Sequence, residues 1–232
     1  SRLGIEHLTV YAFSTENWKR SEEEVSGIFR LLVRYVDSEL RELHENNVRV
    51  KILGDYSVIP RAAVERLEKT LAMTCENTGL RFNIALNYGS RAEIVRAVNR
   101  IREDMKSGKI KEVVEINEEL ISRYLYTGDE NGNIPDPDLI IRTSGEERLS
   151  NFMLWQSAYS ELAFTTCSGR SLLPKSSGAF WSSIRTGIED SEGGNRANDE
   201  DENYFRTVYG STADLCIPGK LLADSHVHLC RT

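Results

Sequence analysis

The chain has 232 residues, with 29 basic and 36 acidic side chains, and 40% of its residues are hydrophobic. This length fits one large α/β domain or two small ones, and it allows a sizeable core without disulfides or metals. The net charge of −7 argues against a general nucleic-acid-binding protein, which carries a basic surplus, but it is compatible with a local basic site for a small anion.

The apolar pattern predicts strands that alternate with helices. We expect strands at residues 7–13, 48–53, 80–86 and 138–142, and helices at residues 21–46, 60–78, 92–105 and 118–125. Ser21 and Glu24 form a predicted capping box at the start of the first helix. The apolar residues expected to face inward from the third long helix are Ile94, Val95, Val98 and Ile101. This order predicts an α/β fold with a central, mostly parallel sheet flanked by helices.

The periodic pattern stops after Thr165. From Thr166 onward the chain is first rich in serine and then dense in acids with glycine and asparagine. This composition is typical of a disordered tail, because such a segment cannot bury enough apolar surface to offset the entropy of ordering. We therefore divide the chain into a domain at residues 1–165 and a divergent tail at residues 166–232.

Polar residues gather where the predicted strands end, which is where parallel sheets bind their ligands. The polar segments lie at residues 14–20, 87–91 and 142–150. The last of them reads RTSGEERLS, and Arg142 and Arg148 with the nearby hydroxyls are suited to a diphosphate, because guanidinium groups match phosphate oxygens. The spacing alone somewhat favours the alternative, a solvated loop in which these arginines pair with Glu146 and Glu147.

Three longer motifs carry a family resemblance. They read FSTENWKRS at residues 13–21, NYGSR at residues 87–91 and DLIIRTSGEERLSNFMLWQSAYSEL at residues 138–162. In this order and spacing they resemble the cis-prenyltransferases, the isoprenyl transferases typified by undecaprenyl diphosphate synthase, over roughly residues 1–165. The resemblance implies a transferase that condenses isopentenyl diphosphate with an allylic prenyl diphosphate, commonly farnesyl diphosphate, to give a cis-polyprenyl diphosphate.

The resemblance also implies Mg²⁺ as cofactor, a homodimer, and a cytoplasmic location at the membrane surface. The four cysteines form no C-x-x-C pair, so we expect them to be reduced. Reduced cysteines are consistent with a cytoplasmic protein. The sequence shows neither a secretory leader nor an apolar run near the roughly 18 residues that a membrane span needs. We therefore expect peripheral contact with a membrane and no binding of nucleic acid.

By position, the resemblance assigns a role to each residue of the site. The substrate-binding residues are Ser14, Thr15, Glu16, Trp18, Arg20, Arg142, Arg148 and Ser150, the last three for isopentenyl diphosphate. Asn17 matches the residue usually assigned as proton acceptor, but a neutral amide is a weak base. We interpret it as orienting a diphosphate oxygen or a water that takes the proton. Glu161 matches a magnesium ligand, and a lone carboxylate suffices where phosphate and water complete the shell.

The start of the chain departs from the family pattern. Family members open with a strand and a loop reading approximately MDGNGRWA, which carries the main magnesium aspartate. Since Ser1 already matches a later position, we expect half a catalytic site and a chain with little or no activity. An alternative is a non-catalytic accessory subunit of a prenyltransferase heterodimer, although the retained RTSGEERLS segment and Glu161 argue against it.

The second departure lies at Thr166. The family continues after Phe164 and Thr165 with a pattern like DVLWPEF, where this chain reads TCSGRSL. Deleting one G from a gene segment that encodes TDVLWPEF yields TTCSGRSL, as found at residues 165–172. We therefore predict that the residues from Thr166 onward are a frameshifted translation.

Overall fold

The computed structural model describes residues 5–111, 115–128, 134–166 and 226–230. The strands are β1 (His7–Ser14), β2 (Arg49–Leu53), β3 (Arg81–Tyr88), β4 (Leu139–Arg142), β5 (Glu161–Phe164) and β6 (His226–Cys230). The α-helices are α1 (Glu22–Glu45), α2 (Arg61–Thr74), α3 (Ser90–Lys106) and α4 (Glu118–Tyr124). The short 3₁₀ helices are η1 (Thr15–Lys19), η2 (Tyr56–Val58) and η3 (Gln156–Tyr159). Among these described residues, no helix is long and apolar enough to cross a membrane.

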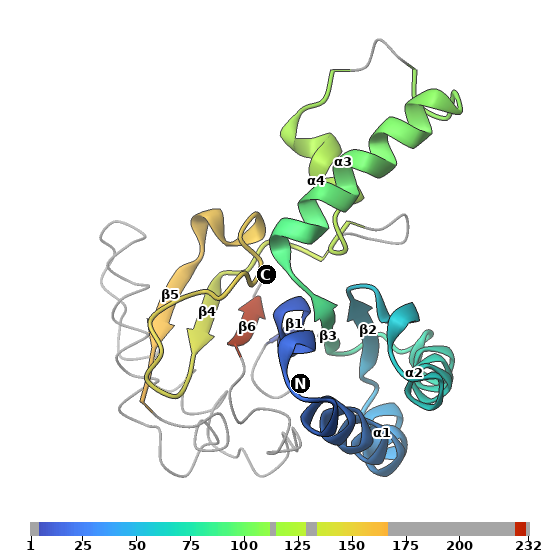
Figure 1. The fold of residues 1–232 in the computed structure, drawn as a ribbon, viewed down its shortest axis with the longest axis vertical. Coiled ribbons are helices and arrows are strands. Elements are labelled where there is room, and N and C mark those ends of the chain that lie inside the picture. The colour runs from blue at the N-terminus through green and yellow to red at the C-terminus, as the bar shows by residue number, and fades with distance from the viewer. Residues whose placement is uncertain (1–4, 112–114, 129–133, 167–225, 231–232) are drawn as a thin grey trace, which may run out of the picture.

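The strands form one sheet in the order β2-β3-β1-β6-β4-β5 (Figure 1). β1 pairs with β3, β3 with β2, and β4 with β5, all in parallel register. β6 lies between β1 and β4 and is antiparallel to both. The predicted α/β fold with a mostly parallel sheet is therefore confirmed.

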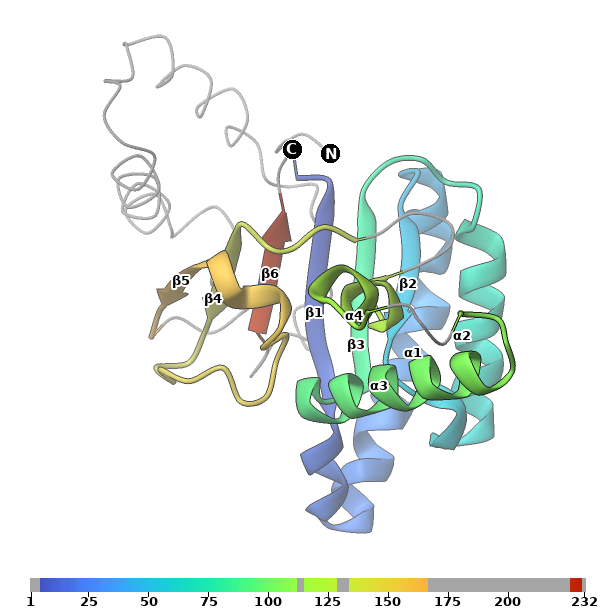
Figure 2. The same cartoon turned by 90° about the horizontal axis from the view of Figure 1, so that it is seen from above.

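Helices cover both faces of the sheet. α1 and α2 lie on one face, and α3 and α4 lie on the other (Figures 1 and 2). Alternate strand residues point to opposite faces. On the α1 side, Val10, Ile52 and Ile84 pack with Phe29 and Leu32. On the other side, one cluster of buried residues contains Leu53, Ala85, Tyr88, Ile134, Phe152 and Met153.

The predicted capping box of the first helix is confirmed. Ser21 Oγ accepts a hydrogen bond from the Glu24 N–H at 3.3 Å, and the Ser21 N–H donates to Glu24 Oε2 at 3.2 Å. These bonds satisfy backbone groups that have no partner within the helix. They hold the start of α1 directly after η1.

The inward face predicted for the third long helix was wrong in part. Val95 and Val98 are 60% and 44% exposed. The buried face instead contains Glu93, Ala97 and Ile101, which are spaced four residues apart. Burial of an acidic residue shifts the centre of this face by about a quarter of a turn from the one that apolar residues alone predict, and Ile101 belongs to both faces.

Two strands were missed by the sequence analysis. β5 is only four residues long, and two of its residues, Leu162 and Phe164, are exposed. β6 lies in the tail that we expected to be divergent, although its sequence HVHLC alternates polar and apolar residues as strands do. Residues 167–225 lie outside the described part of the chain, so the predicted disorder and frameshift from Thr166 stay predictions.

Removal of the α1 cap tests this account of the helix start. The Ser21→Ala variant is expected to unfold with a free energy about 1 kcal/mol lower than that of the parent, because the Glu24 N–H loses its acceptor, the Ser21 hydroxyl. Urea denaturation followed by circular dichroism measures this difference. Ser26→Ala, at an exposed position within the same helix, is the matched control and is expected to be neutral or slightly stabilising. Equal losses in the two variants would contradict a capping role.

Candidate active site

The first two motifs lie side by side at the carboxyl ends of β1 and β3. The parallel register places Ser14, the last residue of β1, opposite Tyr88, the last residue of β3. Trp18 Nε1 of η1 donates to Asn87 Oδ1 at 2.8 Å, and Asn87 Nδ2 donates to the Asp55 carbonyl at 2.7 Å. These two bonds join the segments that follow three neighbouring strands.

η1 carries most of the residues predicted in the first motif. Asn17 Oδ1 accepts the Ser14 N–H at 2.8 Å, so the amide oxygen of Asn17 is used to hold the turn. Trp18 rests on Phe13 and Phe29, with ring centroids 5.1 and 5.7 Å away. The turn is therefore stabilised by the bond from the Ser14 N–H to the Asn17 side chain, by the bond from the Arg20 N–H to the Asn17 carbonyl, and by an aromatic cluster. The Arg20 side chain is exposed just beyond it.

The third motif reaches the first two through Asn151. Its Nδ2 donates to Glu16 Oε1 at 2.9 Å, and its Oδ1 accepts the Arg91 N–H at 2.9 Å. The Ser90 N–H donates to the backbone carbonyl of Asn151 at 2.8 Å. One residue thus contacts both of the other motifs, which lie 60 or more positions away in sequence.

The contact between the three motifs leaves no room for a side chain at Gly89. A Cβ there would lie 2.5 Å from Thr15 Oγ1 and 2.8 Å from Asn151 Nδ2. Both distances are far below ordinary van der Waals contact. The glycine of NYGSR is therefore required by the close approach of η1 and the third motif, with its φ of −163° open to any residue.

The third motif has an unusual backbone. Ser144, Ser150, Asn151 and Met153 all have φ between 46° and 67°. Left-handed conformations cost non-glycine residues of the order of 1 kcal/mol or more each, and they concentrate at ligand sites. The conformation of this loop is thus held by its contacts with the rest of the protein.

The two predicted phosphate-binding arginines have different surroundings. Arg142, at the end of β4, is half-buried and lies close enough to Tyr11 to lower the pKa of its hydroxyl. Burial and the Glu16 carboxylate outweigh this effect and raise the pKa of Tyr11 overall. Arg148 is largely exposed and forms an ion pair with Glu146, as in the solvated-loop alternative. Ser150 is also exposed, on the same loop.

A buried carboxyl group lies beneath the site. Glu93 is 1% exposed and accepts hydrogen bonds from the Tyr88 hydroxyl at 2.5 Å and the Tyr126 N–H at 2.7 Å. Gln156 Nε2 lies 3.4 Å from the same carboxylate. Burial raises the pKa of Glu93, and these donors offset the increase only in part. The network links the end of β3 with the segments on either side of β4.

Glu161, the predicted magnesium ligand, lies apart from this cluster. It is the first residue of β5 and pairs in register with Leu139, at the amino end of β4, whereas Arg142 is at the carboxyl end. Three residues of strand correspond to about 10 Å. In the part of the chain that the structure describes, no three acidic, histidine or cysteine side chains form a group that could hold a metal. These residues therefore do not fit a preformed magnesium site.

The structure thus brings together most of the predicted site. The residues at the carboxyl ends of the strands are Ser14, Thr15, Glu16, Asn17, Trp18, Arg142 and, on the loops beyond, Arg20, Arg148 and Ser150. Sequence reasoning missed Asn151, which lies one residue beyond the polar segment it had marked, and the buried Glu93. A capping signal could have found Asn151, because α3 starts at a glycine that supplies no side-chain cap.

Comparison with known proteins identifies the family. The family model described as "Putative undecaprenyl diphosphate synthase" matches residues 1–169. The chain belongs to this prenyltransferase family. The resemblance inferred from the three motifs is therefore confirmed.

Curated relatives in this family are about half identical to the chain. The isoprenyl transferase of Clostridium perfringens is 49% identical over 164 residues, which are 71% of this chain and 63% of the relative. That of Streptococcus mutans is 52% identical over 165 residues, which are 71% of this chain and 66% of the relative. The chain therefore spans less than two thirds of the length of these relatives.

Two solved structures with a similar fold support the same family assignment. Lavandulyl diphosphate synthase from Lavandula x intermedia, in complex with dimethylallyl diphosphate, matches with a TM-score of 0.68 and 33% identity over 72% of this chain and 70% of that one. A probable undecaprenyl diphosphate synthase from Campylobacter jejuni matches with a TM-score of 0.66 and 33% identity over 84% of each chain. The fold described above is therefore the fold of this family.

The close approach at Gly89 can be tested by adding one methyl group. The Gly89→Ala variant is expected to lose about 1–3 kcal/mol of unfolding free energy, because Thr15 and Asn151 must move apart. Gly27→Ala is the control, since a Cβ at this position in α1 meets nothing within 4 Å and removes a flexible helical glycine. That variant is expected to gain up to about 1 kcal/mol. A neutral Gly89→Ala variant in urea denaturation would show that the motifs are not in contact.

The buried Glu93 predicts a specific pH dependence. Because its folded pKa lies above the unfolded value of 4.5, folding favours the protonated carboxyl. This contribution to stability is complete below about pH 4.5 and is lost as the pH rises through the raised folded pKa. Glu93→Gln removes it, so the stability of the variant relative to the parent is expected to increase with pH over that interval.

Urea denaturation between about pH 4 and pH 8 measures this difference, at about 1.4 kcal/mol for each unit of pKa shift. Glu103→Gln, at an exposed position on α3, is the matched control and should give a constant difference. If the Glu93→Gln difference is equally constant, the carboxyl is not titrating with a raised pKa.

Proposed function

We propose that the protein transfers prenyl groups, condensing isopentenyl diphosphate with an allylic diphosphate such as farnesyl diphosphate to give a cis-polyprenyl diphosphate. The observation that carries this proposal is the junction at Asn151, where three family motifs meet at the carboxyl ends of parallel strands. Such strand ends are where α/β sheets bind ligands. The names of the curated relatives, and the dimethylallyl diphosphate in the lavandulyl diphosphate synthase structure, agree with this chemistry.

Charge at this edge suits a diphosphate. When the allylic diphosphate departs, negative charge develops on its oxygens, and fixed cations stabilise that charge. Arg142 is half-buried, so its guanidinium acts in a less polar environment than a surface arginine. The exposed pair of Arg148 with Glu146 is no obstacle, because such pairs contribute about 0–1 kcal/mol and exchange readily for phosphate.

Asn17 acts as an orienting group in this proposal. Its amide oxygen already accepts the Ser14 N–H, which leaves the Nδ2 group to donate to a diphosphate oxygen or a water. An amide nitrogen with its hydrogens cannot accept a proton at neutral pH. The proton released during condensation therefore passes to a diphosphate oxygen or to water.

Magnesium use is part of the same proposal, because the family generally uses this ion. No step is derived through it, since the described carboxylates do not fit a preformed site. If Mg²⁺ binds together with the diphosphate at the carboxyl end of β4, Glu161 is not placed to contact it, because Glu161 pairs with the amino end of that strand. The role of Glu161 stays a prediction.

A homodimer and contact with a membrane surface complete the proposal. Exposed apolar side chains follow the edge of the sheet at β5, where Tyr159, Leu162 and Phe164 are 98%, 46% and 40% exposed. An edge strand with such residues is typical of a surface that another chain covers. A hydrocarbon product favours release at a membrane.

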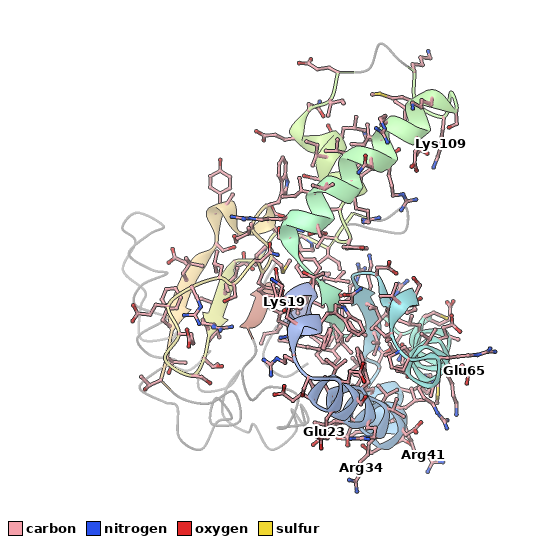
Figure 3. The ribbon with its side chains drawn as sticks, in the orientation of Figure 1. Lys19, Glu23, Arg34, Arg41, Glu65 and Lys109 are labelled. Carbon is pink, nitrogen blue, oxygen red and sulfur yellow. The ribbon has the colours of Figure 1, made fainter. Side chains whose placement is uncertain are left out.

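Arg142 provides the direct test of substrate binding. The Arg142→Ala variant is expected to bind isopentenyl diphosphate about 10- to 100-fold more weakly, because a charge-assisted bond to phosphate contributes about 1.5–3 kcal/mol. Isothermal titration calorimetry measures both dissociation constants. Arg34→Ala is the matched control, since Arg34 points away from the sheet on α1 (Figure 3).

The outcomes separate the competing functions. Unchanged binding in the Arg142→Ala variant would remove Arg142 from the site. A folded parent protein that binds neither isopentenyl nor allylic diphosphate would refute the proposed function. Incorporation of labelled isopentenyl units indicates a transferase, whereas binding without incorporation by the protein or its heterodimer indicates an accessory subunit.

A further inference from the structure

α3 starts without a cap from its own sequence. The residue before it is Gly89, which has no side chain to accept the first N–H groups of the helix. Asn151 supplies the missing acceptors: its backbone carbonyl accepts the Ser90 N–H at 2.8 Å, and its Oδ1 accepts the Arg91 N–H at 2.9 Å. A residue of the third motif therefore caps the helix that follows the second motif.

The same side chain also holds Glu16. Asn151 Nδ2 donates to Glu16 Oε1 at 2.9 Å, and Thr15 Oγ1 donates to Glu16 Oε2 at 3.2 Å. Burial acts to raise the pKa of Glu16, but the hydrogen bonds, that from Asn151 first among them, lower it below its ordinary value. Both carboxylate oxygens of Glu16 thus have a donor, and its orientation is fixed.

The identity of residue 151 follows from three demands. The position needs an acceptor for α3 and a donor for Glu16, and it has a φ of 63°. Serine lacks the reach and the planar pair of groups, and glycine has no side-chain donor or acceptor. Aspartate would cap α3 as well as asparagine does, and its charge would suit a helix N-terminus. Its carboxylate, however, would repel Glu16.

We propose that Asn151 is a positioning residue that fixes the Glu16 carboxylate beside the three joined motifs, and that this orientation supports binding of the diphosphate substrate. The second part rests on the proposed function, whereas the first part is independent of it. The difference between asparagine and aspartate carries the inference, because a purely structural cap would not distinguish them.

An Asn151→Asp variant separates the two roles. It keeps the acceptor for the Arg91 N–H, so the protein is expected to fold with a melting temperature close to that of the parent. It loses the donor to Glu16 and adds a like charge. Amide hydrogen exchange over residues 15–19 is therefore expected to become about 10-fold faster, and binding of isopentenyl diphosphate about 10-fold weaker, since a bond to a charged group is lost.

A double variant, Glu16→Gln with Asn151→Asp, reverses the polarity of the pair. The new amide at position 16 then donates to the new carboxylate at position 151, so the slow exchange of residues 15–19 is expected to return. Glu16→Gln alone is the control and should exchange slowly, because Asn151 still finds an acceptor. Such rescue is not expected if Asn151 acts only as a cap.

Exchange and binding are measured separately on the full chain, by mass spectrometry and calorimetry. The positioning role is overturned if Asn151→Asp leaves the exchange of residues 15–19 unchanged, or if the double variant exchanges as fast as the single one. Unchanged affinity for isopentenyl diphosphate in Asn151→Asp overturns the link to substrate. If the parent binds no diphosphate but the exchange pattern and its rescue appear, the proposed function fails while the positioning role stands.

Discussion

The parallel pairing of β1 with β3 is the constraint on which the rest of the site depends. It places Ser14 opposite Tyr88, so that η1 and the start of α3 leave the sheet at the same edge. The register also determines which side chains enter each of the two cores, because Val10 points toward α1 while Tyr11 points to the other face. A slip of one residue would exchange these faces and expose the apolar set. The close approach at Gly89 follows directly from this register.

Two sets of polar contacts, one half-exposed at Asn151 and one buried at Glu93, then attach the remaining elements to that edge. Asn151 joins the loop after β4 to both other motifs, and Glu93 joins Tyr88 to the segments that contain Tyr126 and Gln156. Burial of a carboxyl group is costly unless donors surround it, and three donors surround Glu93. Contacts of this kind are specific, because an apolar replacement would leave those donors unsatisfied.

The features that depend on residues close together in the sequence were predicted correctly. The strands, the long helices and the Ser21 capping box follow from periodicity and short-range bonds, and the structure confirms them. The polar strand ends and the family motifs marked residues that the structure places together at the carboxyl ends of the strands, while their roles in binding stay predictions. The inward face of α3 was wrong because Glu93 is buried by partners as far as 63 positions away, which no periodicity reports. β5 was missed because a four-residue strand with exposed apolar residues has little pattern.

The same reasoning explains why a net charge of −7 is compatible with the proposed binding of a diphosphate. Over distances beyond about 10 Å, salt screens surface charges, so the total charge has little influence at a given site. In the proposed site, a diphosphate would meet a half-buried Arg142 together with backbone and amide donors, while the Glu16 carboxylate is occupied by its own donors. Glu16 is exposed, but it therefore presents less bare negative charge than a carboxylate without such donors would. The position of Asn151 thus bears on electrostatics as well as on geometry, since its Nδ2 group donates to the Glu16 carboxylate and partly offsets its charge.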